Sequence, residues 1–234
     1  MEKHIALFGG TFDPVHNGHL QIAQFVQNHL NFSQVIFIPN NTPPHRVQPL
    51  ASTQQRLAML NLALRDNPNF IINRAEIDRA GPSYMVDTLD LLSQEHPDSC
   101  PWLILGRDAF DNLPTWHNFD KLITICNFIV LNRAHPQANS KWSQWSEWSE
   151  NYLKSCAITL DEFDILNNTY KYKPNGSVLL LNNSLIDVSG TQIRELIKTS
   201  NNPPMENNNT LKNKLQKFLP KQVVNYILDH ELYI

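Results

Sequence analysis

The first forty residues constrain the fold more than any other part of the chain. A short apolar run at residues 4–8 ends in Gly9 and Gly10, apolar residues recur at helical spacing over residues 20–30, and a second apolar run occupies residues 35–38. A strand, a helix and a strand in this space form a βαβ unit. We therefore expect the two strands to be parallel and the crossover to be right-handed.

The same alternation of apolar runs and helical patterns continues through the chain. Four further strands are expected, at residues 70–72, 102–105, 123–131 and 177–181. Helices are expected at residues 52–64, 83–92 and 113–122, from 189 onward and around 223–228, with Ser52 or Thr53, Ser83 and Ser189 as candidate caps. Six strands interleaved with helices predict an α/β fold, a Rossmann-like, open and mainly parallel sheet with helices on both faces and a C-terminal helical extension.

The pattern also suggests how the chain is divided. We expect a main domain over residues 1–188 and a helical subdomain over residues 189–234 that packs on it. The last three residues, 232–234, are too apolar to be free and should dock on the domain. Residues 134–176 have the character of an insertion. It contains three tryptophans at a spacing of three residues, Trp142, Trp145 and Trp148. We expect these tryptophans to pack onto the main domain.

Composition excludes several classes of protein. With 22 acidic and 19 basic residues the formal net charge is −3, which argues against nucleic acid as a main partner. No apolar run is long enough to span a bilayer, and the N-terminus lacks a signal-peptide pattern, so we expect a cytoplasmic protein without a membrane partner. Three cysteines far apart in sequence form neither a disulfide framework nor a zinc pattern. A homo-oligomer is left open.

The loop after the first strand holds the first candidate site. Gly9, Gly10 and Thr11 are followed by His16 and His19 at the start of the expected helix. The loop lacks both the GxGxxG and the GxxxxGK[ST] patterns of other phosphate-binding loops. The two histidines could belong to a zinc site, but no further ligands stand at a suitable spacing, or they could be residues at the core edge. Their place at the ligand-binding edge favours hydrogen bonds to phosphate oxygens.

Other polar residues follow the ends of expected strands, where α/β sheets bind ligands. His45 and Arg46 follow the second strand, Gly106 and Asp108 the fourth, and Arg133 the fifth. A basic residue there could equally be an ordinary surface residue.

The start of the helix at residue 189 is a second candidate for phosphate. Ser189, Thr191 and Arg194 share its first turn, where free N–H groups and the positive end of the helix dipole favour anions. A capped structural helix is the alternative. No nucleophile motif is present, which indicates direct attack of one bound substrate on another.

These segments match a known group of proteins. GGTFDPVHNGHL resembles the signature of the HxGH nucleotidyltransferase superfamily, and VSGTQIR resembles its second signature. Within that superfamily, the chain is similar to the bacterial nicotinate-nucleotide adenylyltransferases. The similarity to that branch rests on the segments PPHR, GPSYMVDTL, GRDAFDNLPTW and LPKQVVNYILDHELY.

The resemblance implies a reaction in which ATP and nicotinate mononucleotide give deamido-NAD and pyrophosphate, with Mg²⁺ carried on the ATP phosphates. It implies catalytic roles for His16 and His19. It assigns the binding of ATP to nine residues, Gly9, Gly10, Thr11, Phe12, Gly106, Asp108, Ser189, Thr191 and Arg194. It assigns the binding of the acceptor to seven, His45, Arg46, Tyr84, Met85, Thr88, Trp116 and Arg133.

Two positions depart from the family pattern. Met85 stands where family members often have Thr, so backbone N–H groups would replace a side-chain hydroxyl in contacting the nicotinate carboxylate. Gly190 stands where a second small hydroxyl residue is common. Two alternatives remain open, a relative that uses another acceptor, such as nicotinamide mononucleotide or phosphopantetheine, and a non-catalytic nucleotide-binding module that uses the Trp142–Trp148 segment as its interaction surface.

Overall fold

The computed structural model describes residues 3–41, 48–97, 99–132, 145–160, 163, 176–182, 188–200 and 208–234. Among the predicted site residues, His45, Arg46 and Arg133 lie outside these ranges, as does Trp142. Within the described residues, none of the helices has the length and the apolar character needed to cross a bilayer.

The described residues form strands and helices in alternation. The strands are β1 (Lys3–Gly10), β2 (Gln34–Pro39), β3 (Phe70–Ile72), β4 (Ser99–Gly106), β5 (Asn127–Asn132), β6 (Ala157–Ile158) and β7 (Val178–Asn182). The helices are α1 (Asn17–His29), α2 (Thr53–Leu64), α3 (Ala75–Asp78), α4 (Met85–Glu95), α5 (Arg107–Asp111), the 3₁₀ turn η1 (Leu113–Thr115), α6 (Phe119–Ile125), α7 (Glu147–Cys156), α8 (Gly190–Ser200), α9 (Asn208–Leu215) and α10 (Lys221–Asp229).

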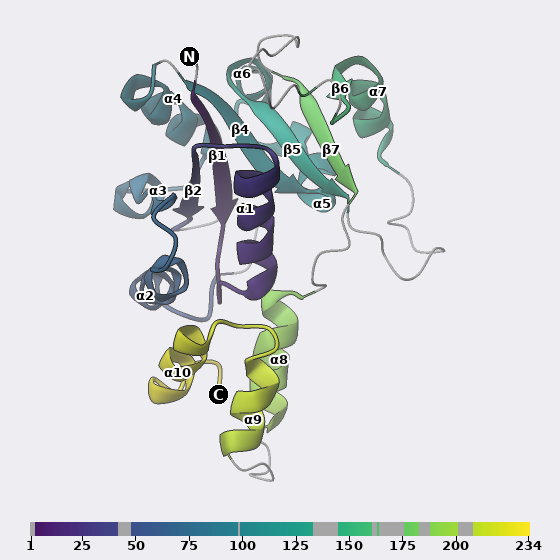
Figure 1. Ribbon diagram of the computed structural model, residues 1–234. Helices are drawn as coiled ribbons and strands as arrows, with labels where there is room; N and C mark the ends of the chain where they lie inside the picture. The colour runs from purple at the N-terminus through teal and green to yellow at the C-terminus, as the bar shows by residue number, and fades with distance from the viewer. Residues whose placement is uncertain are drawn as a thin grey trace. The chain divides into compact units, whose positions relative to one another are not determined.

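The strands belong to one sheet in the order β3-β2-β1-β4-β5-β7-β6 (Figure 1). β1 pairs parallel with β4, β4 with β5, β5 with β7, and β7 with β6. The predicted open, parallel α/β sheet is therefore confirmed. The direction of strand addition reverses between β1 and β4, and ligands of such sheets bind beyond the carboxyl ends of the strands at this point.

The chain divides into two compact units, and the first consists of residues Met1–Gly9, Val26–Ile36 and Tyr84–Ser184. The middle residues of its central strands β4 and β5 are apolar, as expected for parallel strands that are covered on both faces. Trp102, Phe128 and Ile129 are completely buried. Phe32 and Phe163 pack on Trp102, with ring centroids 6.2 and 5.5 Å away.

Helix α7 is attached to this first unit by an aromatic cluster around Phe110, a buried residue of α5. The rings of Trp145, Trp148 and Tyr152 lie 6.1, 5.3 and 6.2 Å from that of Phe110. The predicted packing of the tryptophan segment is therefore confirmed for Trp145 and Trp148. Ser146 caps α7, however, so Trp145 precedes the helix and does not lie on its face.

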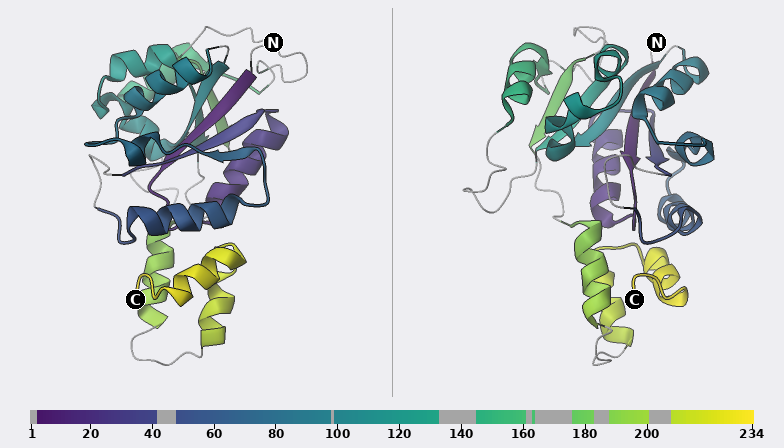
Figure 2. Two further views of the ribbon diagram at one scale, coloured as in Figure 1. Left: turned by 90° about the vertical axis from the view of Figure 1, so that its left-hand side faces the viewer. Right: turned by 180° about the vertical axis from the view of Figure 1, so that it is seen from behind.

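The second unit consists of residues Gly10–Phe25, Phe37–Ser83 and Leu185–Ile234. Helix α9 packs against both α8 and α10, as Figure 2 shows. Helix α10 packs on α2 through its apolar face, where Val223, Val224 and Ile227 are buried. The predicted cap of α2 is confirmed, because Ser52 and Gln55 form a reciprocal capping box.

Three predicted boundaries are wrong. The helix expected at residues 113–122 is divided into η1 and α6. Tyr84, not Ser83, is the N-cap of α4, and the Ser83 hydroxyl instead accepts a hydrogen bond from Asn41 N at 3.1 Å. The fifth strand begins at Asn127, since residues 123–125 complete α6. A short apolar run does not distinguish a helix from a strand. Here Leu122 is the buried residue of α6, and the backbone becomes extended at Cys126.

Helix α4 offers a matched test of this packing. Leu89 is 2% exposed and Leu91 is 43% exposed on the same helix. We expect Leu89→Ala to lower the free energy of unfolding by about 2–5 kcal/mol, because it leaves a cavity in the core. Leu91→Ala should change it by about 0.5 kcal/mol or less. Urea denaturation measures both, and equal effects would contradict the burial of this face.

Candidate functional site

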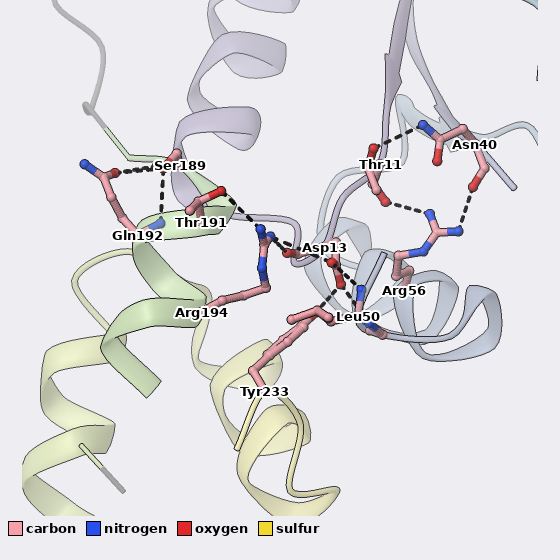
Figure 3. Close-up of polar contacts among 11 residues, drawn as sticks. Thr11, Asp13, Asn40, Leu50, Arg56, Ser189, Thr191, Gln192, Arg194 and Tyr233 are labelled. Atoms are coloured by element: carbon pink, nitrogen blue, oxygen red, sulfur yellow. Dashed lines mark hydrogen bonds and ion pairs between the residues drawn. The ribbon is translucent and has the colours of Figure 1, made fainter. Parts of the chain in front are cut away.

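The loop between β1 and α1 is built around the buried carboxylate of Asp13, which is 7% exposed. One oxygen accepts hydrogen bonds from Ala51 N at 3.1 Å and from the Tyr233 hydroxyl at 2.8 Å. The other accepts from Leu50 N at 2.9 Å (Figure 3). A buried charge is stable only when it is hydrogen-bonded or paired, so these contacts fix the position of the loop.

Arg56 holds the same loop from α2. Its guanidinium donates to Thr11 O at 2.6 Å and to Asn40 O at 2.7 Å, and the residue is only 1% exposed. Burial lowers the pKa of Arg56 from its ordinary value, and the nearby Asp13 carboxylate opposes that shift. The Asn40 side chain in turn donates to Thr11 Oγ1 at 3.1 Å. These bonds tie the loop after β1 to the end of β2.

The two histidines stack on each other. Their ring centroids are 3.6 Å apart with an interplanar angle of 20°, and His16 is 3% exposed. The His16 backbone N donates to His19 Nδ1 at 3.2 Å. An accepting Nδ1 leaves the proton of a neutral imidazole on Nε2, so His19 presents a donor at that atom. Phe12 meets the His19 ring edge-on, with centroids 5.1 Å apart.

Gly18 lies where these histidines pack against the chain before α8. A Cβ added there would stand 3.1 Å from both His16 Nδ1 and Val188 Cγ1. That distance is shorter than ordinary van der Waals contact, so a larger residue would displace His16. Among the described residues, no three His, Cys, Asp or Glu side chains come together in an arrangement that could hold a metal ion.

The first turn of α8 reaches the Asp13 loop through Arg194. Its guanidinium donates to Asp13 O at 2.6 Å and to Thr191 Oγ1 at 3.1 Å, and lies 3.7 Å from the Asp13 carboxylate. Ser189 caps the helix as predicted, since its hydroxyl accepts from Gln192 N at 3.2 Å. The structure thus brings together two segments nearly two hundred residues apart in sequence. Their roles toward phosphate stay predictions.

The predicted acceptor residues that the structure describes lie in the first unit. Tyr84 and Met85 begin α4, and the Met85 methyl comes so close to Gly9 that a Cβ there would be 2.7 Å away. The ring of Tyr84 stacks on His117, with centroids 4.2 Å apart. His117 follows Trp116 directly, so this stack joins the start of α4 to the end of η1.

Three other predicted residues of this unit have defined places. Thr88 is completely buried, and its hydroxyl donates to Tyr84 O at 3.4 Å. Gly106 ends β4, and Asp108 lies in the first turn of α5. Because β1 and β4 are parallel neighbours, Gly9 and Gly106 stand at the same edge of the pair. Their contacts with substrates stay predictions.

Several residues that shape the site were not predicted from the sequence: Asp13, Asn40, Arg56, His117 and Tyr233. Arg56 carried a detectable signal, because it shares the helical face of Met59 and Leu60, which are both buried. An arginine on an apolar face needs a partner, and only the tertiary structure identifies it.

Arg56 can be tested against an arginine near the end of the same helix. Arg56→Met should lower the free energy of unfolding by about 2–4 kcal/mol, because the Thr11 and Asn40 carbonyl oxygens lose their buried donor. Arg65 is exposed just beyond α2, so Arg65→Met should have little effect. Thermal and urea unfolding measure the difference. Similar losses in both variants would contradict a specific role of Arg56.

The chain is similar to known proteins over almost its whole length. Residues 7–196 match the cytidylyltransferase-like family. The chain is 37% identical over 229 residues, 98% of both chains, to a protein of Legionella pneumophila (strain Lens) named probable nicotinate-nucleotide adenylyltransferase. It is 36% identical over 234 residues, 100% of both chains, to the nicotinate-nucleotide adenylyltransferase of Salmonella typhimurium.

A solved structure supports the fold. The nicotinic acid mononucleotide adenylyltransferase of Plasmodium falciparum, complexed with NaAD, superposes with a TM-score of 0.69 at 15% identity, covering 99% of this chain and 98% of that one. An identity this low shows the fold alone. The sequence matches extend over the whole length, and the chain therefore belongs to the cytidylyltransferase-like family, among the nicotinate-nucleotide adenylyltransferases.

Proposed function

We propose that the protein transfers the adenylyl group of ATP to nicotinate mononucleotide, forming deamido-NAD and pyrophosphate in NAD biosynthesis. The names of its full-length relatives support this activity. The observation that carries it is the stacked histidine pair, in which a backbone amide donates to His19 Nδ1, so that Nε2 is the donor atom of a ring held in place. Such a preorganised donor is suited to an oxygen that gains charge during phosphoryl-group chemistry.

The chemistry needs no covalent intermediate. A phosphate oxygen of nicotinate mononucleotide attacks the α-phosphorus of ATP in line, a new P–O bond forms, and the bond from the α-phosphorus to the bridging oxygen breaks. Pyrophosphate leaves with that oxygen and its electron pair. Mg²⁺ enters on the ATP phosphates as part of the substrate. His16 and His19 stabilise the charge on the α-phosphate and on the departing pyrophosphate.

The β- and γ-phosphates are assigned to the start of α8. Ser189 caps the helix there, and the Thr191 hydroxyl and the Arg194 guanidinium are the side-chain donors that we assign, together with the first N–H groups of the helix. Arg194 already contacts the loop that carries the histidines. The residues that lead into that loop are also assigned to ATP, namely Gly9, Gly10, Thr11 and Phe12. Gly106 and Asp108 contact the adenosine.

The acceptor is assigned to the start of α4 and the end of η1. Trp116 provides an aromatic surface for the pyridine ring, next to the stacked Tyr84 and His117. The nicotinate carboxylate is bound by backbone N–H groups at Met85, since the α4 cap makes no side-chain hydrogen bond. His45, Arg46 and Arg133 contribute positive charge to the phosphate of the mononucleotide.

The histidine role is tested on α1 itself. His19→Ala should reduce turnover by about two to three orders of magnitude, as loss of one charge-stabilising donor does. His29→Ala, in the exposed last turn of the same helix, should leave turnover near the wild-type value. Pyrophosphate release with saturating ATP, Mg²⁺ and nicotinate mononucleotide measures both. Near-normal turnover of the His19 variant would refute the role.

The choice of acceptor is tested with a panel of nicotinate mononucleotide, nicotinamide mononucleotide and phosphopantetheine. We expect kcat/KM to favour nicotinate over nicotinamide by about 100-fold or more, because a site that pairs with a carboxylate leaves donors unsatisfied when an amide replaces it. Phosphopantetheine should give no pyrophosphate. Equal kcat/KM for the two pyridine nucleotides would contradict the assignment, and binding of ATP without turnover would favour a non-catalytic module.

A further inference from the structure

We infer that the C-terminal tail is a positioning element for the triphosphate, in which Tyr233 acts through Asp13 on the loop that carries the catalytic histidines. This inference rests on the proposed function and adds a residue to it. Tyr233 is the penultimate residue of the chain, 220 positions from Asp13, and its hydroxyl donates to Asp13 Oδ1 at 2.8 Å. The side chain thus reaches from the end of the chain to the centre of the loop (Figure 3).

The tail beyond α10 is held in a defined conformation. Glu231 and Tyr233 have positive φ angles of 49° and 67°, which residues with a side chain rarely adopt. Leu232 between them is 8% exposed, and its N–H donates to Ile227 O at 3.0 Å. Ile234, in contrast, is 67% exposed. The chain therefore buries Leu232 and half-buries Tyr233, whereas Glu231 and Ile234 are exposed.

The contacts of Asp13 show what the tail holds. Its carboxylate is contacted by Leu50 N, Ala51 N, the Tyr233 hydroxyl and the Arg194 guanidinium, all distant in sequence. Asp13 itself stands two residues after Thr11 and three before His16. A shift of this carboxylate would therefore move the backbone on both sides. Burial, followed by the nearby Asp13 charge, raises the pKa of Tyr233, so the hydroxyl remains a donor at neutral pH.

A shift of Asp13 would also move the start of α8. Arg194 donates to the Asp13 carbonyl oxygen at 2.6 Å, and a Cβ at Gly190 would lie 3.0 Å from that oxygen and 3.1 Å from Arg194 Nη1. Packing this close transmits a displacement of Asp13 to the first turn of α8. Tyr233 thereby influences both segments assigned to the triphosphate, the histidine loop and the Ser189–Arg194 turn.

The test removes one hydroxyl and keeps the ring. Tyr233→Phe should lower kcat/KM for ATP about 5- to 20-fold, a part of the effect expected when a charged group loses a hydrogen bond. KM for ATP should rise, whereas KM for nicotinate mononucleotide should stay within about twofold, because the pyridine ring and its carboxylate are assigned to the start of α4 and the end of η1, which contain neither Asp13 nor Tyr233. Tyr226→Phe is the matched control, the same change in α10, where the ring stacks on His230. It should leave all constants unchanged.

A second measurement is independent of catalysis. Amide hydrogens of the ligand-free variant should exchange faster at Leu50 and Ala51, because these two amides donate hydrogen bonds to the Asp13 carboxylate. A role in folding alone would reduce the active fraction and leave both KM values at their wild-type level. Unchanged KM for ATP and unchanged exchange in Tyr233→Phe would overturn the inference. A wild-type protein that releases no pyrophosphate would refute the proposed function instead, so the two failures are distinguishable.

Discussion

The second unit depends on the buried carboxylate of Asp13. A charge that leaves water must be compensated, and the loop after β1 offers too few donors of its own. Compensation comes from Leu50 and Ala51 before α2, from Arg194 in α8, and from Tyr233 at the end of the chain. One buried charge therefore joins four segments that are far apart in sequence. These contacts hold the loop that carries the histidines, because all of them converge on the Asp13 carboxylate.

Arg56 complements this carboxylate with positive charge. Its guanidinium ties Thr11 O to Asn40 O and is itself almost fully buried. With the backbone of the loop fixed at residues 11 and 13, the His16 backbone N–H holds the ring of His19, and the ring of His16 stacks on it. This is the preorganisation that charge stabilisation requires, since donors that need not reorient cost nothing at the moment of reaction.

The first unit positions the residues that we assign to the acceptor. Its parallel strands place Gly9 and Gly106 at one edge, and Met85 lies against Gly9 at the start of α4. The Tyr84–His117 stack then fixes the segment that contains Trp116. Stacking between the rings of Tyr84 and His117 limits their rotation.

The sequence by itself determined the parallel sheet, most of the strand and helix order, the caps at Ser52 and Ser189, and the motifs that identify the family, because these depend on local periodicity and short spacings. Sequence patterns gave the wrong cap at Ser83 and the wrong start of β5, because a polar cap or a short apolar run is compatible with more than one local structure. They also missed α9. Only the tertiary structure decided which groups compensate Asp13 and Arg56. Those partners are set by chain packing, and no local pattern encodes a hydrogen bond between residues 13 and 233.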